Sequence, residues 1–592
     1  MFKLFKKNAK TALLFECLYF GILSFIYVPI MSALMNLSIK AANIKYLSMS
    51  TLKMYLSSPL TWIIIIALLI IIVFAVLYEI SAMIIIYDAS YHNKKITMCE
   101  LVGSAFFASI KVVLPKNLLI IPFLLLVLPV GLIIDISSIT SYFSIPGFIT
   151  DFIFANTFLS VLVAVVAIVL MYLVLKFLFS LEYFTLDQNG FISACKKSKE
   201  LTKKKKIKTA IYILIGAIIL FLLHIVITII VSLFVAFIVS LFVNDNPETI
   251  AKAEYIARVF AFTLVNIPII PLGFAIISNK FYGISEEKNI DVPTITNKKY
   301  NKAKLWLVII IIIVCVAGLV VNVFVDTGTG LSPYIYEKEE TTIVAHRGYS
   351  DVAPENNMPA FEKAIECGVT MIELDVHQTK DGVIVVTHDA NINRIAGVDK
   401  NVYDLTFEEL ETYDVGSWFS EKYKGLKVAT LDQVIKLCKD NDVEIQIELK
   451  PTGNEENFEE NVIKVVRDND YENMVFLASL NGDCVKKCNE LAPDIRTLYI
   501  MAIASGDVAN IDFADAFSLE ETNVTFELVE EAHRLCKPVY VWTINDADSV
   551  DELIEKNVDG LVTDKIEEIR DKVQEIEIEN KSLYSKMFDS TK

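Results

Sequence analysis

The chain has 592 residues, of which 54% are hydrophobic, and its mean hydropathy of +0.50 is too high for an ordinary soluble protein. The net charge of −17 is unevenly distributed: residues 1–336 contain 28 Lys and Arg against 16 Asp and Glu, and residues 337–592 contain 26 against 55. A basic, apolar half followed by an acidic half predicts a membrane domain followed by a soluble domain. It excludes a nucleic-acid-binding protein, because the basic residues lie between apolar runs.

Seven apolar runs in the first half are long enough to cross a bilayer as helices, which takes about 20 residues each. The first is too long for a cleaved signal peptide and has no small-residue cleavage site after it. The fifth contains only Gly216 and no Pro, so it predicts one long helix. We therefore expect about seven transmembrane helices within residues 1–325, near 12–36, 60–86, 117–135, 152–180, 208–243, 256–279 and 305–325.

Positive charge predicts the orientation of these spans, since Lys and Arg are enriched in cytoplasmic loops. Lysines precede the first span, at positions 3, 6, 7 and 10, and others cluster at 196–206 and 280–304. The loop at 37–59, with Lys40, Lys45 and Lys53 and no acid, does not fit this pattern. Seven spans that begin in the cytoplasm predict an extracellular C-terminal half in the cell membrane.

One further stretch, at 100–116, has aromatic and aliphatic residues among small ones. It predicts either an interfacial or re-entrant segment or an ordinary loop helix packed on the bundle, and we favour the second.

Strands and helices alternate after a Gly-, Thr- and Pro-containing linker at 326–340. The strand runs lie near 342–346, 371–376, 383–387, 444–449, 474–479, 496–500, 515–519, 538–543 and 560–563, with amphipathic stretches between them. This rhythm predicts an α/β domain at 341–575, a (β/α)₈ TIM barrel with one irregular element. The connection from His388 to Leu431 is longer than a barrel loop needs, so we expect an insertion at about 390–430, and a charged tail at 576–592.

Reactive side chains follow several of these strand runs. The four stretches are Ala345-His346-Arg347-Gly348, Glu373-Leu374-Asp375, Thr387-His388-Asp389 and Glu448-Leu449-Lys450. Buried parallel strands deliver such groups to the carboxyl end of a sheet. Two histidines, three carboxylates and two cations suit metal-assisted attack on a phosphodiester.

The order of these motifs and the residues in them resemble the glycerophosphodiester phosphodiesterase family from about Thr341 to about Asp564. Further motifs in the family's order are Pro354-Glu355-Asn356, Asp381-Gly382, Val541-Trp542-Thr543-Ile544-Asn545 and Gly560-Leu561-Val562-Thr563-Asp564. The resemblance implies a TIM barrel with a small helical insertion over its mouth. It also implies hydrolysis of glycerophosphodiesters to glycerol 3-phosphate and an alcohol. Asn357 and Cys536-Lys537 depart from the family pattern, away from the proposed reactive groups.

Three carboxylates form the candidate metal site. Glu373 and Asp375 alternate onto one face of their strand, and Glu448 comes from another strand end. Carboxylate oxygens suit a hard divalent metal such as Ca²⁺ or Mg²⁺, and by resemblance these three residues are the metal ligands.

Two histidines, His346 and His388, are the candidate catalytic acid and base, because the usual pKa of imidazole lies near neutrality. By resemblance, one takes the proton of the glycerol 2-hydroxyl as it attacks phosphorus, and the other protonates the departing alcohol. Water then opens the cyclic phosphate. The sequence does not assign the two roles.

Four residues are candidates for binding substrate. Arg347 and Lys450 are expected to hold the phosphate. Glu355 is expected either to bind the metal or to order Arg347. Trp542 is expected either to stack on the glycerol carbons or to fill the top of the barrel.

Two other functions remain open. One is a membrane transporter or lipid-binding protein with a regulatory barrel, because seven spans exceed what anchoring requires; against it, no span shows a run of inward-facing ionisable residues. The other is a phospholipase C- or D-like enzyme acting on intact lipids. The expected partners are the lipid bilayer and a small-molecule glycerophosphodiester, with no nucleic acid, and the sequence indicates no protein partner.

Overall fold

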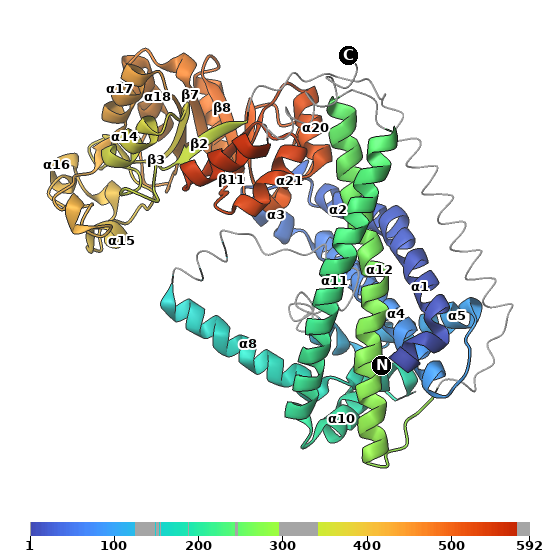
Figure 1. The fold of residues 1–592 in the computed structure, drawn as a ribbon. Coiled ribbons are helices and arrows are strands. Elements are labelled where there is room, and N and C mark those ends of the chain that lie inside the picture. The colour runs from blue at the N-terminus through green and yellow to red at the C-terminus, as the bar shows by residue number, and fades with distance from the viewer. Residues whose placement is uncertain are drawn as a thin grey trace. The chain divides into compact units, whose positions relative to one another are not determined.

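The computed structural model describes residues 2–124, 149, 153, 156–187, 189–242, 247–294 and 341–576, and the chain divides into two compact units (Figure 1). The helical unit comprises Met1–Leu37, Trp62–Ile145 and Thr150–Ser332. The barrel unit comprises Ser38–Thr61, Pro146–Ile149 and Pro333–Lys592. A short segment of the apolar half therefore belongs to the same compact unit as the barrel.

Long apolar helices dominate the first half of the chain. Their bounds are α1 (Phe2–Ile22), a π-helical turn (Leu23–Tyr27), α2 (Val28–Ala41), α4 (Pro59–Tyr91), α5 (Met98–Ser109), α8 (Thr157–Phe177), α9 (Ser180–Leu186), α10 (Phe191–Thr202), α11 (Lys206–Phe242) and α12 (Pro247–Glu287). The run at 208–243 forms the single helix α11, as predicted, and its 37 residues extend about 55 Å at 1.5 Å per residue.

Four helices in the described part of the chain are long and apolar enough to cross a membrane: Pro59–Tyr91, Thr157–Leu186, Lys206–Val231 and Ile267–Glu287. The helices Met98–Val113 and Pro115–Leu124, bent by 92°, add a fifth if they form one broken span. The predicted span at 12–36 is helical, but the π-helical turn interrupts it. The predicted span at 305–325 and most of that at 117–135 lie outside the described residues, so the count of seven stays a prediction.

The stretch at 100–116 forms α5 and two short 3₁₀ turns. A capping box between Thr97 and Glu100 begins α5 by satisfying backbone N–H groups at its first turn. Leu101, Ala105 and Ala108 on this helix are buried in the core of the helical unit. The stretch therefore packs as part of the helix bundle.

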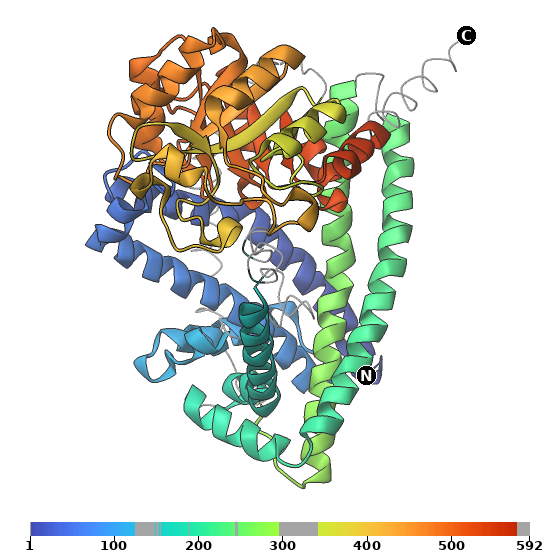
Figure 2. The ribbon, with the colours of Figure 1, turned by 90° about the vertical axis from the view of Figure 1, so that its left-hand side faces the viewer.

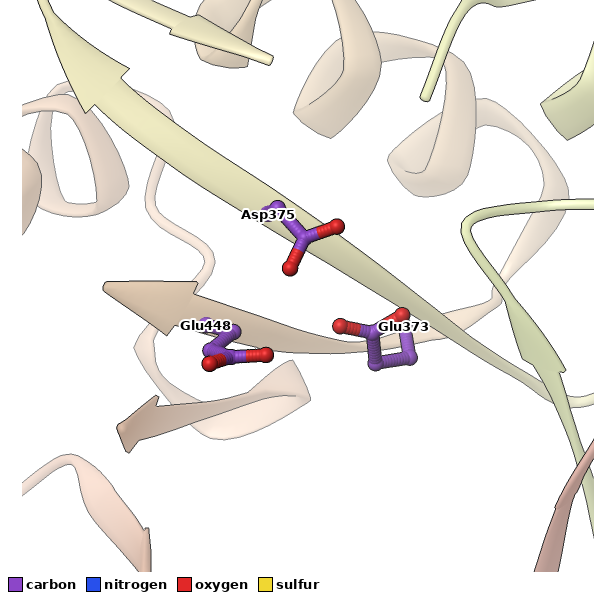
Figure 3. Close-up of side chains that lie close together, drawn as sticks. All are labelled: Glu373, Asp375 and Glu448. Carbon is purple, nitrogen blue, oxygen red and sulfur yellow. The ribbon is translucent and has the colours of Figure 1, made fainter. Parts of the chain in front are cut away.

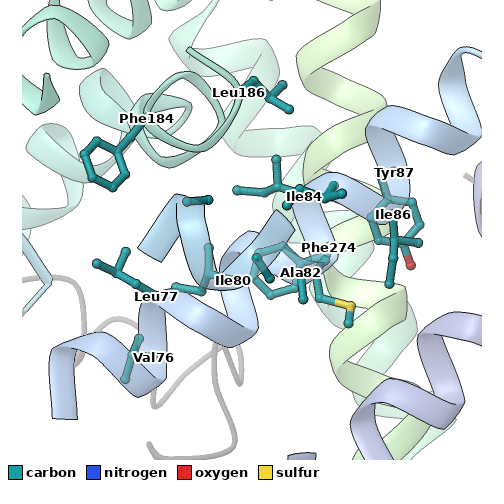
Figure 4. Packing of buried hydrophobic residues seen from close by; sticks show 14 of the residues in the cluster. Val76, Leu77, Ile80, Ala82, Ile84, Ile86, Tyr87, Phe184, Leu186 and Phe274 are labelled. Atoms are coloured by element: carbon teal, nitrogen blue, oxygen red, sulfur yellow. The ribbon is translucent and has the colours of Figure 1, made fainter. Parts of the chain in front are cut away.

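The core of the helical unit is centred on α4, a predominantly apolar helix whose apolar residues are spread around its circumference. Figure 4 shows Leu77, Ile80 and Ile84 of α4 in the same cluster as Phe184 of α9 and Phe274 of α12. Contacts of this kind hold segments together that are about 200 residues apart in sequence.

Among the described helical residues, four carboxylates are buried: Glu16 of α1, Glu79 and Asp88 of α4, and Glu182 of α9. Asp88 accepts hydrogen bonds from the hydroxyl groups of Tyr282 (2.9 Å) and Thr294 (2.8 Å). The sequence showed no run of inward-facing ionisable residues in any span, and these buried acids are single residues. Only helix packing turns such single acids inward, so the sequence alone did not identify them as buried.

The second half contains the predicted TIM barrel. Eight parallel strands follow each other around the ring in the order β2-β12-β11-β10-β8-β7-β6-β3, and β3 pairs with β2 to close it. The bounds are β2 (Thr342–His346), β3 (Met371–Gln378), β6 (Glu444–Leu449), β7 (Val475–Ser479), β8 (Arg496–Met501), β10 (Ala516–Glu520), β11 (Val539–Trp542) and β12 (Gly560–Thr563). The predicted (β/α)₈ fold is confirmed.

Amphipathic helices surround this ring (Figure 2). They are α14 (Met358–Glu366), α17 (Leu431–Asn441), α18 (Phe458–Asp468), α19 (Gly482–Leu491), α20 (Phe526–Arg534) and α21 (Val550–Glu555). In α17, for example, Leu431, Val434, Ile435 and Cys438 are buried with helical spacing. Alternate strand residues, such as Val344 and Tyr540, fill the interior of the ring instead.

The irregular element is β4 (Ile384–Val386), which lies outside the ring and pairs antiparallel with β3. On its other side, β4 pairs antiparallel with β5 (Ala429–Thr430). The predicted insertion lies between β4 and β5. It contains α15 (Asn393–Ala396), α16 (Phe407–Leu410) and the 3₁₀ turns Val402–Asp404 and Glu421–Tyr423. A small core that includes Val402, Leu410 and Val415 holds it together.

Candidate functional site

Three carboxylates converge at the carboxyl ends of β3 and β6. Glu373 and Asp375 point to one side of β3, and Glu448 points to the same region from β6 (Figure 3). The strand register places Asp375 directly opposite Glu448. One oxygen of each carboxylate lies within 4.8 Å of the other two, and all three residues are buried. The alternation predicted for Glu373 and Asp375 therefore delivers both to a common site.

The crowding of these acids changes their protonation. Burial, with Asp375 close by, raises the pKa of Glu373 to about 8. Burial likewise raises the pKa of Glu448. The pKa of Asp375 stays well below its usual value in spite of burial, because Lys450 and Arg347 lie beside it. The site therefore carries more negative charge than its own cations balance once all three acids are ionised.

A hard divalent cation fits this donor set. Such an ion takes oxygen ligands, and its charge would allow Glu373 and Glu448 to ionise in spite of burial. Lys450 already occupies part of the space: its Nζ lies 3.0 Å from Asp375 Oδ1 and 3.0 Å from Glu448 Oε1. The three residues that would hold the ion are those expected from the sequence.

His346, at the end of β2, lies beside this group and is oriented by a carboxylate. Its Nδ1 is 2.7 Å from Asp564 Oδ1, and its Nε2 is 4.0 Å from Glu373 Oε2. Ser350 and Asn545 donate hydrogen bonds of 2.6 Å to Asp564. Burial opposes the charged imidazolium. The carboxylates of Asp564 and Glu373 outweigh this effect of burial, so the pKa of His346 is raised.

His388 follows β4 and has a similar arrangement. Its Nδ1 lies 2.7 Å from Asp389 Oδ1, and the other oxygen of Asp389 accepts a 2.6 Å hydrogen bond from Arg394 Nε. His377, which points away from the three carboxylates, has its Nε2 3.2 Å from the His388 carbonyl oxygen. His388 lines a pocket together with the Glu355–Asn357 segment and residues of the insertion that include Trp418. Each catalytic candidate is thus a histidine with a carboxylate partner.

Arg347 is held by acids on two sides. Its NH1 donates to Glu355 Oε1 (3.0 Å), and its Nε lies 3.4 Å from Asp375 Oδ2. Arg394 binds both oxygens of Glu355, at 2.7 and 3.1 Å. Glu355 therefore lies between the two arginines, and its two expected roles remain predictions.

The turn after β2 makes this arrangement possible. Arg347 (φ 57°) and Gly348 (φ 79°) both have left-handed backbone conformations. A Cβ atom on Gly348 would lie 2.8 Å from the backbone of Ala360. The turn also brings the Arg347 backbone N–H to Glu373 Oε2, at 3.0 Å. Gly348 thus allows the chain to reverse directly beside the metal-site candidates.

Trp542 lies at the end of β11. Its Nε1 donates to the Ser518 carbonyl oxygen (3.1 Å), and its ring packs against the interior core of the barrel. Both expected roles, stacking on the glycerol carbons and filling the top of the barrel, remain predictions.

Several residues at the site were not predicted to take part. Asn356 joins Asp375 through its side chain, donating to Oδ2 (2.6 Å) and accepting from the Asp375 backbone N–H (3.0 Å). Asp564 and Asp389, which orient the two histidines, stood in the recognised motifs without a role. Their position at strand ends was the available signal. Arg394 had none, because it lies in the insertion.

Comparison with known families gives two matches. Residues 346–568 match the model of the glycerophosphoryl diester phosphodiesterase family. Residues 1–322, more than half of the chain, match the model of the membrane domain of glycerophosphoryl diester phosphodiesterase.

Individual relatives match the barrel half. The glycerophosphodiester phosphodiesterase of Caldanaerobacter subterraneus subsp. tengcongensis is 32% identical over 233 residues, covering 38% of this chain and 94% of that protein. That of Bacillus altitudinis is 30% identical over 237 residues, covering 38% and 94%. A solved structure of an Oleispira antarctica phosphodiesterase, in complex with the product sn-glycerol-3-phosphate, is 23% identical, with coverage of 40% and 97% and a TM-score of 0.37.

Proposed function

We propose a mechanism for this chain from the premise that it belongs to the glycerophosphoryl diester phosphodiesterase family. Its activity is the hydrolysis of glycerophosphodiesters, which are small molecules, to glycerol 3-phosphate and an alcohol. The observation that carries the mechanism is the group of three buried carboxylates from β3 and β6, together with two carboxylate-paired histidines, His346 at the end of β2 and His388 after β4.

A divalent cation, Ca²⁺ or Mg²⁺, is the proposed cofactor. Held by Glu373, Asp375 and Glu448, it would supply Lewis-acid stabilisation of charge on the phosphate. Lys450 and Arg347 lie against the same carboxylates and add fixed positive charge for the phosphate oxygens. Glu355 keeps the Arg347 guanidinium in place.

The two histidines carry the proton transfers. One accepts the proton of the glycerol 2-hydroxyl as that oxygen bonds to phosphorus, and the other donates a proton to the alcohol oxygen as its bond to phosphorus breaks. The product of this step is a cyclic phosphate. Water then opens the ring with the histidine roles reversed, which yields glycerol 3-phosphate. Asp564 and Asp389 orient the imidazole rings for both steps.

The membrane helices tether this barrel, and we propose that it works on the outer side of the cell membrane. The support is the Lys-rich N-terminus and the Lys clusters at 196–206 and 280–304. With seven spans, all three lie on the same side of the membrane, and such clusters favour the cytoplasmic side. On that side the enzyme would meet glycerophosphodiesters from outside the cell.

The substrate class can be tested with the purified full-length protein in detergent. We expect release of glycerol 3-phosphate from glycerophosphocholine and glycerophosphoglycerol, and a cyclic glycerophosphate that accumulates transiently when single turnovers are quenched. Intact phosphatidylcholine should release neither phosphocholine nor choline at a comparable rate. Preferred cleavage of the intact lipid would favour the phospholipase alternative and contradict the proposal.

A further inference from the structure

The loop between the first two predicted spans forms part of the barrel unit. Within Ser38–Thr61, called here the docking loop, the strand β1 (Tyr46–Leu47) pairs antiparallel with β9 (Ser505–Gly506) of the barrel half. Tyr46 lies opposite Gly506, and Leu47 lies opposite Ser505. The Asp507 backbone N–H also donates to the Lys45 carbonyl oxygen, at 3.3 Å. Backbone pairing of this kind gives the contact a defined register.

A buried tyrosine hydroxyl adds side-chain contacts to this pairing. Tyr499 of β8 is fully buried, and its hydroxyl lies 2.7 Å from Ser48 Oγ and 2.8 Å from Ser50 Oγ. The Tyr46 ring meets the Tyr499 ring edge-on, with centroids 6.3 Å apart. Since a buried hydroxyl without a partner is costly, the serines of the docking loop satisfy a polar group inside the barrel unit.

The two ends of the docking loop are tied together. Ser38 Oγ lies 2.7 Å from the Tyr55 hydroxyl, and its carbonyl oxygen accepts a hydrogen bond from Thr61 Oγ1 at 3.2 Å. Ser58 Oγ donates to the Ala41 carbonyl oxygen at 3.1 Å. The loop therefore leaves one helix and enters the next at one place, as expected of a loop that stays on one side of a membrane.

Charge fits this arrangement. The docking loop contains three lysines and no acid, while residues 337–592 contain 55 acids against 26 bases. Three lysines in an outside loop do not fit the enrichment of Lys in cytoplasmic loops. They belong, however, to a segment that packs on an acidic domain, and opposite charges favour that association.

The position on the ring separates this contact from catalysis. β8 lies four strands from β2 in either direction around the barrel, and β2 carries His346. β9 is in the connection that follows β8. The docking loop therefore attaches at the carboxyl end of β8, four strands around the ring from β2, and the contacts described above involve none of the proposed metal or acid–base groups.

We propose that the docking loop anchors the barrel on the side of the membrane where this loop emerges. The helical segment from Phe2 to Ala41 connects the Lys-rich N-terminus to the loop. The sequence predicts that this segment crosses the membrane once, at 12–36, although it is not one of the four helices of the described residues that are long and apolar enough to do so. With a cytoplasmic N-terminus, that crossing places the loop and the barrel outside. This orientation does not depend on the number of later spans or on the reading of any other loop.

A cysteine pair tests the docking. Leu47→Cys and Ser505→Cys are combined in the full-length protein, with the nine native cysteines replaced and a specific protease site placed in the 326–340 linker. After mild oxidation in native membranes and cleavage, we expect the two fragments to remain linked until they are reduced. The matched pair Leu47→Cys and Glu366→Cys, with Glu366 exposed on α14, should separate. Equal separation of both pairs would overturn the docking.

A second measurement needs no cysteine replacement. The same protease is added to wall-stripped cells that express the otherwise native chain with the linker site. Cleavage before permeabilisation is expected if the barrel faces outward. Cleavage only after permeabilisation, with the protein stable and active, would overturn the orientation.

Tyr499→Phe adds a check on the contact between the docking loop and β8. We expect this variant to slow formation of the disulfide between positions 47 and 505 several-fold, whereas Tyr403→Phe in the insertion should not.

Discussion

Both proposed catalytic histidines, His346 and His388, have Nδ1 2.7 Å from a carboxylate oxygen, which would orient each ring for proton transfer. We predict that His346→Ala and His388→Ala each lower kcat for glycerophosphocholine by at least about a hundredfold, the usual scale for a positioned acid or base. His533→Ala is a useful contrast, because this histidine lies on α20 and pairs with Asp559 away from the site. Near-normal turnover by both active-site variants would contradict the assignment.

Asp389 links His388 to Arg394 and should make stability depend on pH. Burial favours its neutral form, but hydrogen bonds from His388 and Arg394 outweigh burial and lower its pKa. Its contribution to stability is therefore full above the pKa of an unfolded Asp, about 3.9, and is lost as the pH falls through the lower folded value. We predict that Asp389→Asn is less stable than wild type at pH 6 and that this difference shrinks below about pH 4.

Thermal unfolding of the full-length protein in detergent at a series of pH values measures this difference. A gap between the two proteins that is constant from pH 6 to pH 3 would show that Asp389 gains nothing from its ionised form in the fold.

Sequence reasoning at the residue scale found groups that chemistry makes conspicuous at strand ends, such as His346 and Glu448. It did not identify which carboxylate contacts the ring of each histidine. Asp564 is more than 200 residues from His346, and only the pairing of β12 with β2 brings the two together. Partnerships of this kind depend on strand order, which the sequence does not display.

At the scale of elements, the strand runs were predictable because each is a short β-branched or aliphatic segment bounded by turn residues. The sequence shows nine strand runs, one more than an eight-stranded ring needs, and the extra one is the run at 383–387. In the structure this run forms β4, which pairs antiparallel with β3 outside the ring and precedes the insertion. The pairing of the docking loop with β9 was not predictable, because two-residue strands leave no periodic signal and their partner is more than 450 residues away.

The insertion contributes Arg394, which binds Glu355 and Asp389 together and lies 5.4 Å from the Trp418 ring centroid. We predict that Arg394→Ala lowers kcat/KM by about tenfold, since ordering contacts around catalytic groups are commonly worth 10–100-fold. Arg534→Ala, which removes an arginine paired with Glu531 on α20, should leave kcat/KM unchanged. Steady-state kinetics of both variants test this, and equal values for the two would remove Arg394 from the account.

For the whole molecule, composition separated an apolar basic half from an acidic half, and the two family matches follow that division. Composition did not show that Ser38–Thr61 belongs with the second half. It also missed the buried carboxylates of the helical unit, because helix packing decides which face a single acid occupies. Order along the chain therefore carries little information about these contacts.

The central claim is that a divalent cation held by Glu373, Asp375 and Glu448 is required for hydrolysis at this site. The most direct measurement is glycerol 3-phosphate release from glycerophosphocholine by the purified full-length protein, with chelator and then with added Ca²⁺ or Mg²⁺, for wild type and Glu448→Gln. We predict that chelation abolishes wild-type turnover, that one of the two cations restores it, and that Glu448→Gln needs a much higher cation concentration or stays inactive. Full turnover in excess chelator, or a Glu448→Gln variant with wild-type metal dependence, would contradict the account.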